Sequence, residues 1–238
     1  MKLLTATATT ATALLAALAA AAANFNPNPN EWTFKGGMLS IPRWQIAATS
    51  VASKALFAGG RLDSGSYVDN VDVYDNQSDS WSTAKLSIVR SEIGAGSFNG
   101  RYALFAGGFD NQFRTLDIVD VYDAQEDKWS TVKLTQPRAG PRVIDLGDRA
   151  AIVGGLTSDW NYLSKAVDYI DSDLKVTAGS DMPVGYPQFG IVASNPDAGF
   201  GVMTAGYQNN KPGERFNQFE ASNQTTIFTR DGAEKAGP

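Results

Sequence analysis

The stretch ALFAGG occurs at Ala55–Gly60 and again at Ala103–Gly108, 48 residues later. A third apolar run that ends in a diglycine, AAIVGG at 150–155, follows after a further 47 residues. Short apolar runs bounded by turn residues are typical of buried β-strands. Self-similarity at a period of roughly 20–50 residues is the signature of a repeat protein. The chain therefore predicts at least three copies of one structural unit.

Other features repeat in the same register. VDVYD at 71–75 recurs at 119–123 and as VDYID at 167–171, and DSWSTAKL at 79–86 recurs as DKWSTVKL at 127–134. The alternation of valine and aspartate in VDVYD has the period of a half-buried strand. No stretch after residue 24 has a helical period. Each unit is therefore predicted to hold about four short strands, which in the first unit lie around residues 46–51, 55–58, 67–74 and 81–86.

The diglycine and the tryptophan have physical reasons to repeat. A glycine pair at the end of the second strand allows positive φ and a close approach of backbone, where a side chain would obstruct. Trp81 and Trp129, one period apart, are large apolar groups that can pack between adjacent sheets. No phosphate-loop motif surrounds the glycines, and no helix is expected after them.

This pattern resembles the kelch repeat, in which a diglycine after an apolar strand precedes a tyrosine and then a tryptophan. The resemblance spans about residues 32–220 and implies an all-β propeller of four-stranded antiparallel blades. A fourth, degenerate unit is expected from FGVMTAGYQ at 200–208, with ERFNQFE at 214–220 as its third strand and TTIFTR at 225–230 as an outer strand. The offset ends favour a ring of about four blades, closed when the strand around Trp32 joins the last blade. A partial ring that dimerises is the alternative.

The N-terminus predicts secretion. After Lys2 comes an uncharged run rich in Ala, Leu and Thr that ends in small residues at Ala23, as a signal peptide does. A membrane anchor is the weaker alternative. The expected organisation is a signal peptide at 1–23 cleaved after Ala23, an Asn/Pro-rich linker at 24–31, and the propeller at 32–238. N-glycosylation sequons begin at Asn76 and Asn223.

Composition excludes several kinds of chemistry. The chain has neither cysteine nor histidine, so no zinc site built from those residues and no Ser-His-Asp triad can form. Galactose-oxidase-like copper radical enzymes share the kelch scaffold, but their copper and radical residues have no counterpart here. Only oxygen ligands remain for a metal, and we expect no cofactor. A net charge of −5 argues against nucleic-acid binding.

The variable loops between the second and third strands are the predicted binding face. They occupy residues 61–70, 109–117, 156–165 and 207–215, where aromatic and amide side chains could stack on a sugar and hydrogen-bond its hydroxyls. The alternative is that these side chains pack the loops and cap turns. The candidates are Tyr67, Asp110, Asn111, Phe113, Asp159, Trp160, Tyr162, Tyr207 and Asn209.

Two further sets repeat once per unit, which favours structural roles for them. Converging arginines could grip an acidic ligand, but an arginine at this position looks like part of the kelch pattern itself. Paired carboxylates could hydrolyse glycosides, but catalytic residues should be unique rather than repeated. The arginines are Arg43, Arg90 and Arg138, and the acidic pairs are Asp72/Asp75, Asp120/Asp123 and Asp168/Asp171.

The sequence leads to three functional hypotheses. The first is a secreted, non-enzymatic recognition protein that binds an extracellular glycan or protein partner through one propeller face. The second is an extracellular carbohydrate-active hydrolase, lyase or isomerase that uses carboxylates and tyrosine in a central pocket. The third is a partial or degenerate propeller without activity of its own. The loop composition favours the first.

Overall fold

The computed structural model describes residues 37, 39–157, 163–182, 185, 191–197, 199–204, 207–208, 220–221, 225–229 and 232–236. The chain divides into two units, residues 1–38 and 39–238, and every described strand belongs to the second unit. The expected signal peptide, the Asn/Pro-rich linker and the strand around Trp32 all lie outside the described residues. No helix occurs in the part that is described, and none there is long and apolar enough to cross a membrane.

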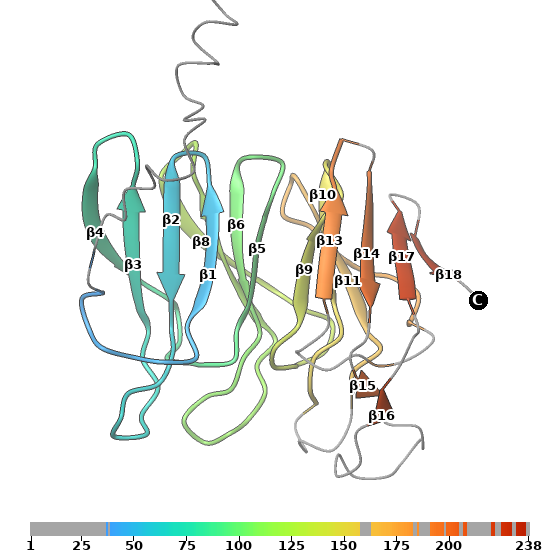
Figure 1. The fold of residues 1–238 in the computed structure, drawn as a ribbon, viewed down its shortest axis with the longest axis horizontal. Coiled ribbons are helices and arrows are strands. Elements are labelled where there is room, and N and C mark those ends of the chain that lie inside the picture. Colours follow the sequence, from blue (N-terminus) through green and yellow to red (C-terminus); the bar gives the residue numbers. More distant parts are fainter. Residues whose placement is uncertain are drawn as a thin grey trace, which may run out of the picture. The chain divides into compact units, whose positions relative to one another are not determined.

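Four antiparallel sheets of four strands make up the structure (Figure 1). In each of the first three, strands adjacent in sequence are neighbours in the sheet. The first sheet holds β1 (Ala47–Val51), β2 (Lys54–Ala58), β3 (Asn70–Asp75) and β4 (Ser80–Lys85). The second holds β5 (Gly94–Phe98), β6 (Tyr102–Ala106), β7 (Ile118–Asp123) and β8 (Lys128–Lys133). The third holds β9 (Arg142–Asp145), β10 (Arg149–Val153), β11 (Val167–Asp171) and β12 (Val176–Ala178).

The fourth sheet corrects one prediction. It consists of β13 (Ile191–Asn195), β14 (Phe200–Thr204), β17 (Thr225–Thr229) and β18 (Gly232–Ala236). The segment TTIFT forms β17 and pairs directly with β14 as the third strand, not as the outer strand. The outer position is held by β18, so this sheet has its four strands without one from the N-terminus. Of the ERFNQFE segment only Glu220 is described, in the short β16 (Glu220–Ala221), which pairs with β15 (Tyr207–Gln208).

The sheets pack face to face through the alternation that the sequence predicted. Val71 and Val73 of β3 are buried in an apolar cluster that also contains Phe105 and Tyr122 of the second sheet. The other face of the second sheet, with Leu104 and other apolar residues, packs on the third. The third packs on the fourth through a cluster that includes Met203 and Phe228. Each interface thus joins consecutive sheets.

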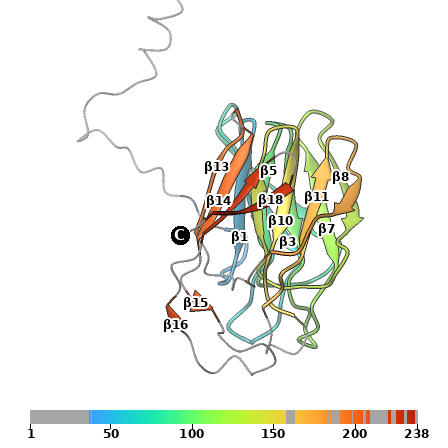
Figure 2. The ribbon, with the colours of Figure 1, turned by 90° about the vertical axis from the view of Figure 1, so that its right-hand side faces the viewer.

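The first strands of consecutive sheets also contact one another. These contacts join β1 to β5, β5 to β9 and β9 to β13, and Figure 2 shows the strands of the successive sheets from the side. The contact between β5 and β9 is close, because a Cβ on Gly96 would lie 2.7 Å from the Cβ of Val143. The arrangement is consistent with a propeller-like fold, and no closed ring is formed by the described strands.

The diglycine has both predicted properties. Gly107 has φ +61° and Gly108 has φ +114°. A Cβ on Gly107 would lie 2.1 Å from the carbonyl oxygen of Arg138, and one on Gly108 would lie 2.6 Å from that of Ser91. Such distances are not compatible with a side chain. The repeated glycines are therefore confirmed as a requirement of backbone packing.

Candidate functional site

The sheets present two ends, which we call the loop face and the hairpin face. The loop face is formed by the segments before β1, β5 and β9 and by the loops that join β2 to β3, β6 to β7 and β10 to β11. The hairpin face is formed by the turns β1–β2, β5–β6 and β9–β10 together with β3–β4 and β7–β8. In Figure 1 the hairpin face lies at the top and the loop face at the bottom.

The repeated arginines are buried inside the sheets. The Arg90 guanidinium lies 2.6 Å from an oxygen of Asp120, and their side chains are 0% and 3% exposed. Arg90 also donates a hydrogen bond of 3.0 Å to the carbonyl oxygen of Phe105, and the backbone N–H of Ser87 donates one of 3.0 Å to Asp120. Burial lowers the pKa of Arg90, and the charge of Asp120 opposes that shift.

The same arrangement, here called the arginine tie, occurs in all three complete units. Arg43 pairs with Asp72 and Arg138 pairs with Asp168, each at 2.6 Å. For Asp72 the cost of burial raises the pKa, but hydrogen bonds from Ser40 and Arg43 outweigh it, so the pKa is lowered. The side chains of Arg43, Arg90 and Arg138 are 0% exposed. We correct their assignment as ligand-binding candidates, because a group with no accessible surface cannot grip a ligand.

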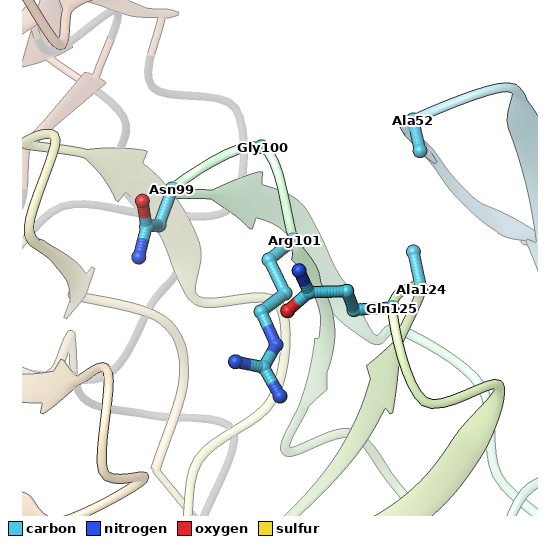
Figure 3. Close-up of a pocket in the computed structure, with 6 residues that line it drawn as sticks. All are labelled: Ala52, Asn99, Gly100, Arg101, Ala124 and Gln125. Carbon is cyan, nitrogen blue, oxygen red and sulfur yellow. The ribbon is translucent and has the colours of Figure 1, made fainter.

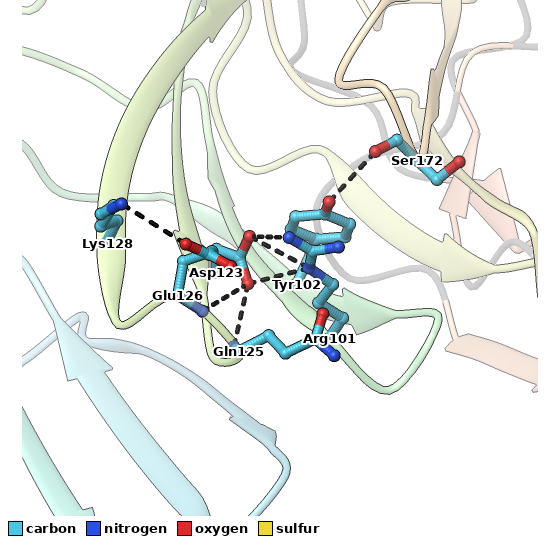
Figure 4. A network of polar contacts seen from close by, with 7 residues as sticks. All are labelled: Arg101, Tyr102, Asp123, Gln125, Glu126, Lys128 and Ser172. Carbon is cyan, nitrogen blue, oxygen red and sulfur yellow. Dashed lines mark hydrogen bonds and ion pairs between the residues drawn. The ribbon is translucent and has the colours of Figure 1, made fainter.

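The second aspartate of each acidic pair caps a turn on the hairpin face. Asp123 accepts a hydrogen bond of 2.9 Å from Arg101 and another of 2.9 Å from the backbone N–H of Gln125 (Figure 4). The hydrogen bonds from Arg101 lower the pKa of Asp123 to about 2. Asp75 and Asp171 also accept backbone hydrogen bonds from residues two positions on. These carboxylates are occupied by turn and ion-pair contacts, as their repetition indicated.

On the loop face, Tyr67 lies in a small apolar cluster with Phe109, Ala139 and Leu156. These residues come from loops of three consecutive sheets, and Tyr67 is only 6% exposed. The Asn111 side chain contributes to the same junction, because its Oδ1 accepts a hydrogen bond of 2.8 Å from the backbone N–H of Tyr67. Tyr67 and Asn111 therefore join neighbouring loops to each other.

Asp110 shapes the loop that presents Phe113. It accepts hydrogen bonds of 2.9 Å from the backbone N–H groups of Gln112 and Arg114, and burial of its carboxylate is outweighed by these bonds, so its pKa is lowered. Phe113 is 50% exposed and has φ +57°, which is uncommon for a bulky residue. Its ring meets Tyr67 edge to face, with centroids 6.1 Å apart. The loop thus holds an aromatic ring outward in a strained conformation.

Two neighbouring residues of the loop face were not among the predicted candidates. Trp44 is 47% exposed, and its backbone bridges to Arg61, which bridges in turn to Tyr67. The Arg61 guanidinium lies 5.2 Å from the Trp44 ring and 5.9 Å from the Tyr67 ring. The signal that would have found them is position, since Arg61 directly follows a diglycine and Trp44 directly follows Arg43. We call Trp44, Arg61, Tyr67 and Phe113 the aromatic patch.

The remaining predicted positions are less fully described. Asn76 is exposed in the turn after β3, which is compatible with a sequon. Tyr207 lies in β15 and pairs with Ala221, with no description of its side chain. The other candidates, Asp159, Trp160, Tyr162, Asn209 and Asn223, lie outside the described residues.

The hairpin face contains pockets that the sequence did not predict. One of about 410 Å³ is lined by the turns at Ala52, Asn99–Arg101 and Ala124–Gln125 (Figure 3). Another of about 430 Å³ lies on the other side of the same Asn99–Gly100 turn and is lined by Asp145 and Asp197. Burial raises the pKa of Asp145, although backbone N–H groups of Gly147 and Asn99 oppose the shift. The Asn99–Gly100 dipeptide, a strong hairpin signal, was the available clue.

The chemistry open to these sites is limited. Within the described ranges no three acidic side chains gather in a way that could hold a metal ion. The aromatic patch offers ring faces, one cation and backbone groups, which suit recognition. The hairpin-face pocket beside Asp145 offers a carboxyl group that retains its proton more readily than usual.

Comparison with known proteins places the fold but not the activity. No family model matches the chain, and no curated protein sequence matches it. Among solved structures, the one titled "Structure of YjhT" is similar, with a TM-score of 0.66 over 87% of this chain and 74% of that chain. The two sequences are 15% identical. Likeness at this identity shows a shared fold alone.

Proposed function

We propose that this protein is a kelch-type propeller-like recognition protein, secreted and non-enzymatic, that binds an extracellular glycan or protein through its loop face. The observation that carries the proposal is the aromatic patch. There Trp44 and Phe113 are about half exposed, and Phe113 is held outward at positive φ. A strained residue persists only where its surroundings impose it, and such residues cluster at functional sites.

The arrangement of the patch supports stacking recognition. Phe113 and Trp44 flank Tyr67 and Arg61, whose guanidinium lies against two rings. Exposed aromatic rings beside an arginine are the groups enriched at binding hot spots. The repeated carboxylates supply no competing acid–base site, since Asp72, Asp120 and Asp168 are at most 3% exposed.

The proposal is tested with the secreted protein on a glycan array and in pull-downs from extracellular fluid. A Trp44→Ala/Phe113→Ala variant should lose about tenfold or more in affinity for whatever the wild type binds. Trp81→Ala, a similarly exposed tryptophan on β4, is the matched control and should bind normally. Blank results in both formats with folded wild-type protein would reject the recognition hypothesis. A mature N-terminus at Asn24 would support secretion.

One observation favours the enzymatic alternative, a hydrolase, lyase or isomerase acting on carbohydrate. Asp145 lies on a first strand, where the second sheet has Ser97 and the first has Ser50 opposite the equivalent alanines. It is therefore a non-repeated carboxyl group beside a pocket, with a raised pKa. If this alternative holds, Asp145→Asn abolishes turnover of a sugar substrate while Asp123→Asn, in a repeated position, does not.

A further inference from the structure

Each interface between consecutive sheets joins two different kinds of face. Between the first and second sheets, Leu56, Val71 and Val73 form an aliphatic face of the first sheet. Against it lie Phe105, Tyr122 and Trp129 of the second sheet, an aromatic face. Phe105 and Tyr122 are 0% and 3% exposed there. Every sheet thus has one face for the sheet before it and one for the sheet after it.

The first sheet has an aromatic face of its own, built from the equivalent residues one period earlier. The Phe57 and Trp81 rings lie 5.8 Å apart at 30°, and those of Phe105 and Trp129 lie 5.9 Å apart at 29°. Tyr74 and Trp81 are 5.2 Å apart at 44°, while their counterparts are 5.2 Å apart at 43°. The face therefore has the geometry of a packed interface already in place.

This face is not covered by another of the described sheets. Trp81 is 45% exposed, and Phe57 and Tyr74 are half-buried, whereas Phe105 and Tyr122, their equivalents in the second sheet, are buried. Three adjacent aromatic rings in a preformed arrangement are an exposed apolar patch of the kind that marks an interaction site. The face requires an aliphatic sheet surface as its partner.

The fourth sheet has such a surface. Met203 and Phe228 point toward the third sheet, so the alternate residues Val202 and Ile227, which are paired across β14 and β17, lie on the opposite face. Val202 and Ile227 are half-buried, and Phe200 on the same face is 38% exposed. Figure 1 shows the first and fourth sheets at opposite sides of the view. One chain thus carries one open face of each kind.

We propose that the open aromatic face of the first sheet binds the open aliphatic face of the fourth sheet in a second copy of this chain. The first strands contact one another from β1 to β5 to β9 to β13, whereas β1 and β13 form no comparable contact among the described strands. Two copies related by a two-fold axis cover both faces of both chains, so the assembly closes rather than polymerises. This interface uses neither the aromatic patch nor the hairpin-face pockets.

Solution mass is the first test. Light scattering on the full secreted protein should give twice the mass of one chain, and Trp81→Arg should reduce it to the mass of one chain. Trp44→Ala, at the aromatic patch, is the matched control and should leave the dimer intact. A wild-type protein with the mass of one chain overturns the proposal, whether or not the protein binds a ligand.

Site-specific crosslinking identifies the faces, since the chain contains no cysteine. Thr83 lies on the strand face of Trp81, and Thr229 lies opposite Phe200 on the open face of the fourth sheet. A mixture of Thr83→Cys chains and Thr229→Cys chains should give a covalent dimer with a short bis-maleimide. Thr131→Cys, at the equivalent position of the second sheet, should not replace Thr83→Cys. Crosslinking only within a single chain that carries both cysteines would show ring closure by one chain, and it would overturn the proposal, as would a dimer without the mixed crosslink.

Discussion

Replacing Asp120 with alanine should cost about 3–5 kcal/mol in the free energy of unfolding. The side chain is 3% exposed and its carboxylate lies 2.6 Å from the fully buried guanidinium of Arg90. Its removal leaves a positive charge inside the sheet without a counterion, which is where losses of this size arise. It also removes the acceptor for the backbone N–H of Ser87. For a chain of this length the loss corresponds to a fall in Tm of roughly 6–20 °C.

Thermal unfolding followed by circular dichroism measures this loss, and two further variants test its cause. Asp120→Asn keeps an acceptor for Ser87 and should cost less than alanine. Arg90→Met combined with Asp120→Leu removes both charges and should be more stable than Asp120→Ala alone, because no charge is then left unpaired. Glu126→Ala breaks the pair with Lys128, whose side chains are 55% and 73% exposed, and should change stability by at most about 1 kcal/mol. An Asp120→Ala variant as stable as Glu126→Ala would refute the reasoning.

Two other predictions concern backbone packing and pH. Gly107→Ala should prevent folding or destabilise the protein severely, whereas Gly100→Ala, at a similar φ of +59° but with nothing within 4 Å of the added Cβ, should cost only about 1–2 kcal/mol; equal Tm values for the two variants would contradict the close approach. Asp145 has a folded-state pKa raised by burial, so its contribution to stability is fully present below the unfolded pKa of about 3.9 and is lost as pH rises through the folded value. Asp145→Asn should therefore raise Tm at pH 7, with the gain vanishing at pH 3, and a gain that persists in acid would exclude this cause.

The regular part of the fold could be predicted because local signals and repeat spacing agree there. ALFA, VDVYD and KWSTVK became β6, β7 and β8, and the positive φ of the diglycine follows from its place between strand and turn. Agreement failed in the fourth unit. A spacing of 49 residues favoured ERFNQFE as the third strand, but the strand that pairs with β14 is TTIFT. Period alone was a poor guide there, because the connection between these two strands is longer than in the other units.

The candidate site could be predicted only in outline, because burial of a loop residue depends on its neighbours from another sheet. Tyr67 and Phe113 are both aromatic residues of long loops, yet one is 6% and the other 50% exposed. Trp81 and Trp129 have the same local sequence and differ in burial because only one faces a neighbouring sheet. The hairpin-face pocket beside Asp145 arises where turns of different sheets meet, and no single stretch of sequence contains that information.

The arginine tie has a consequence for how such a chain gains or loses units. Arg90, Asp120 and Ser87 all belong to the segment that runs from one outer strand through the next complete sheet. Duplication or deletion of that segment therefore moves both charges of a buried pair together and leaves no ion stranded in a neighbouring sheet. Each new junction exchanges only an apolar face, which tolerates substitution at similar volume. The number of sheets can drift during evolution while the electrostatics of every remaining sheet stay intact.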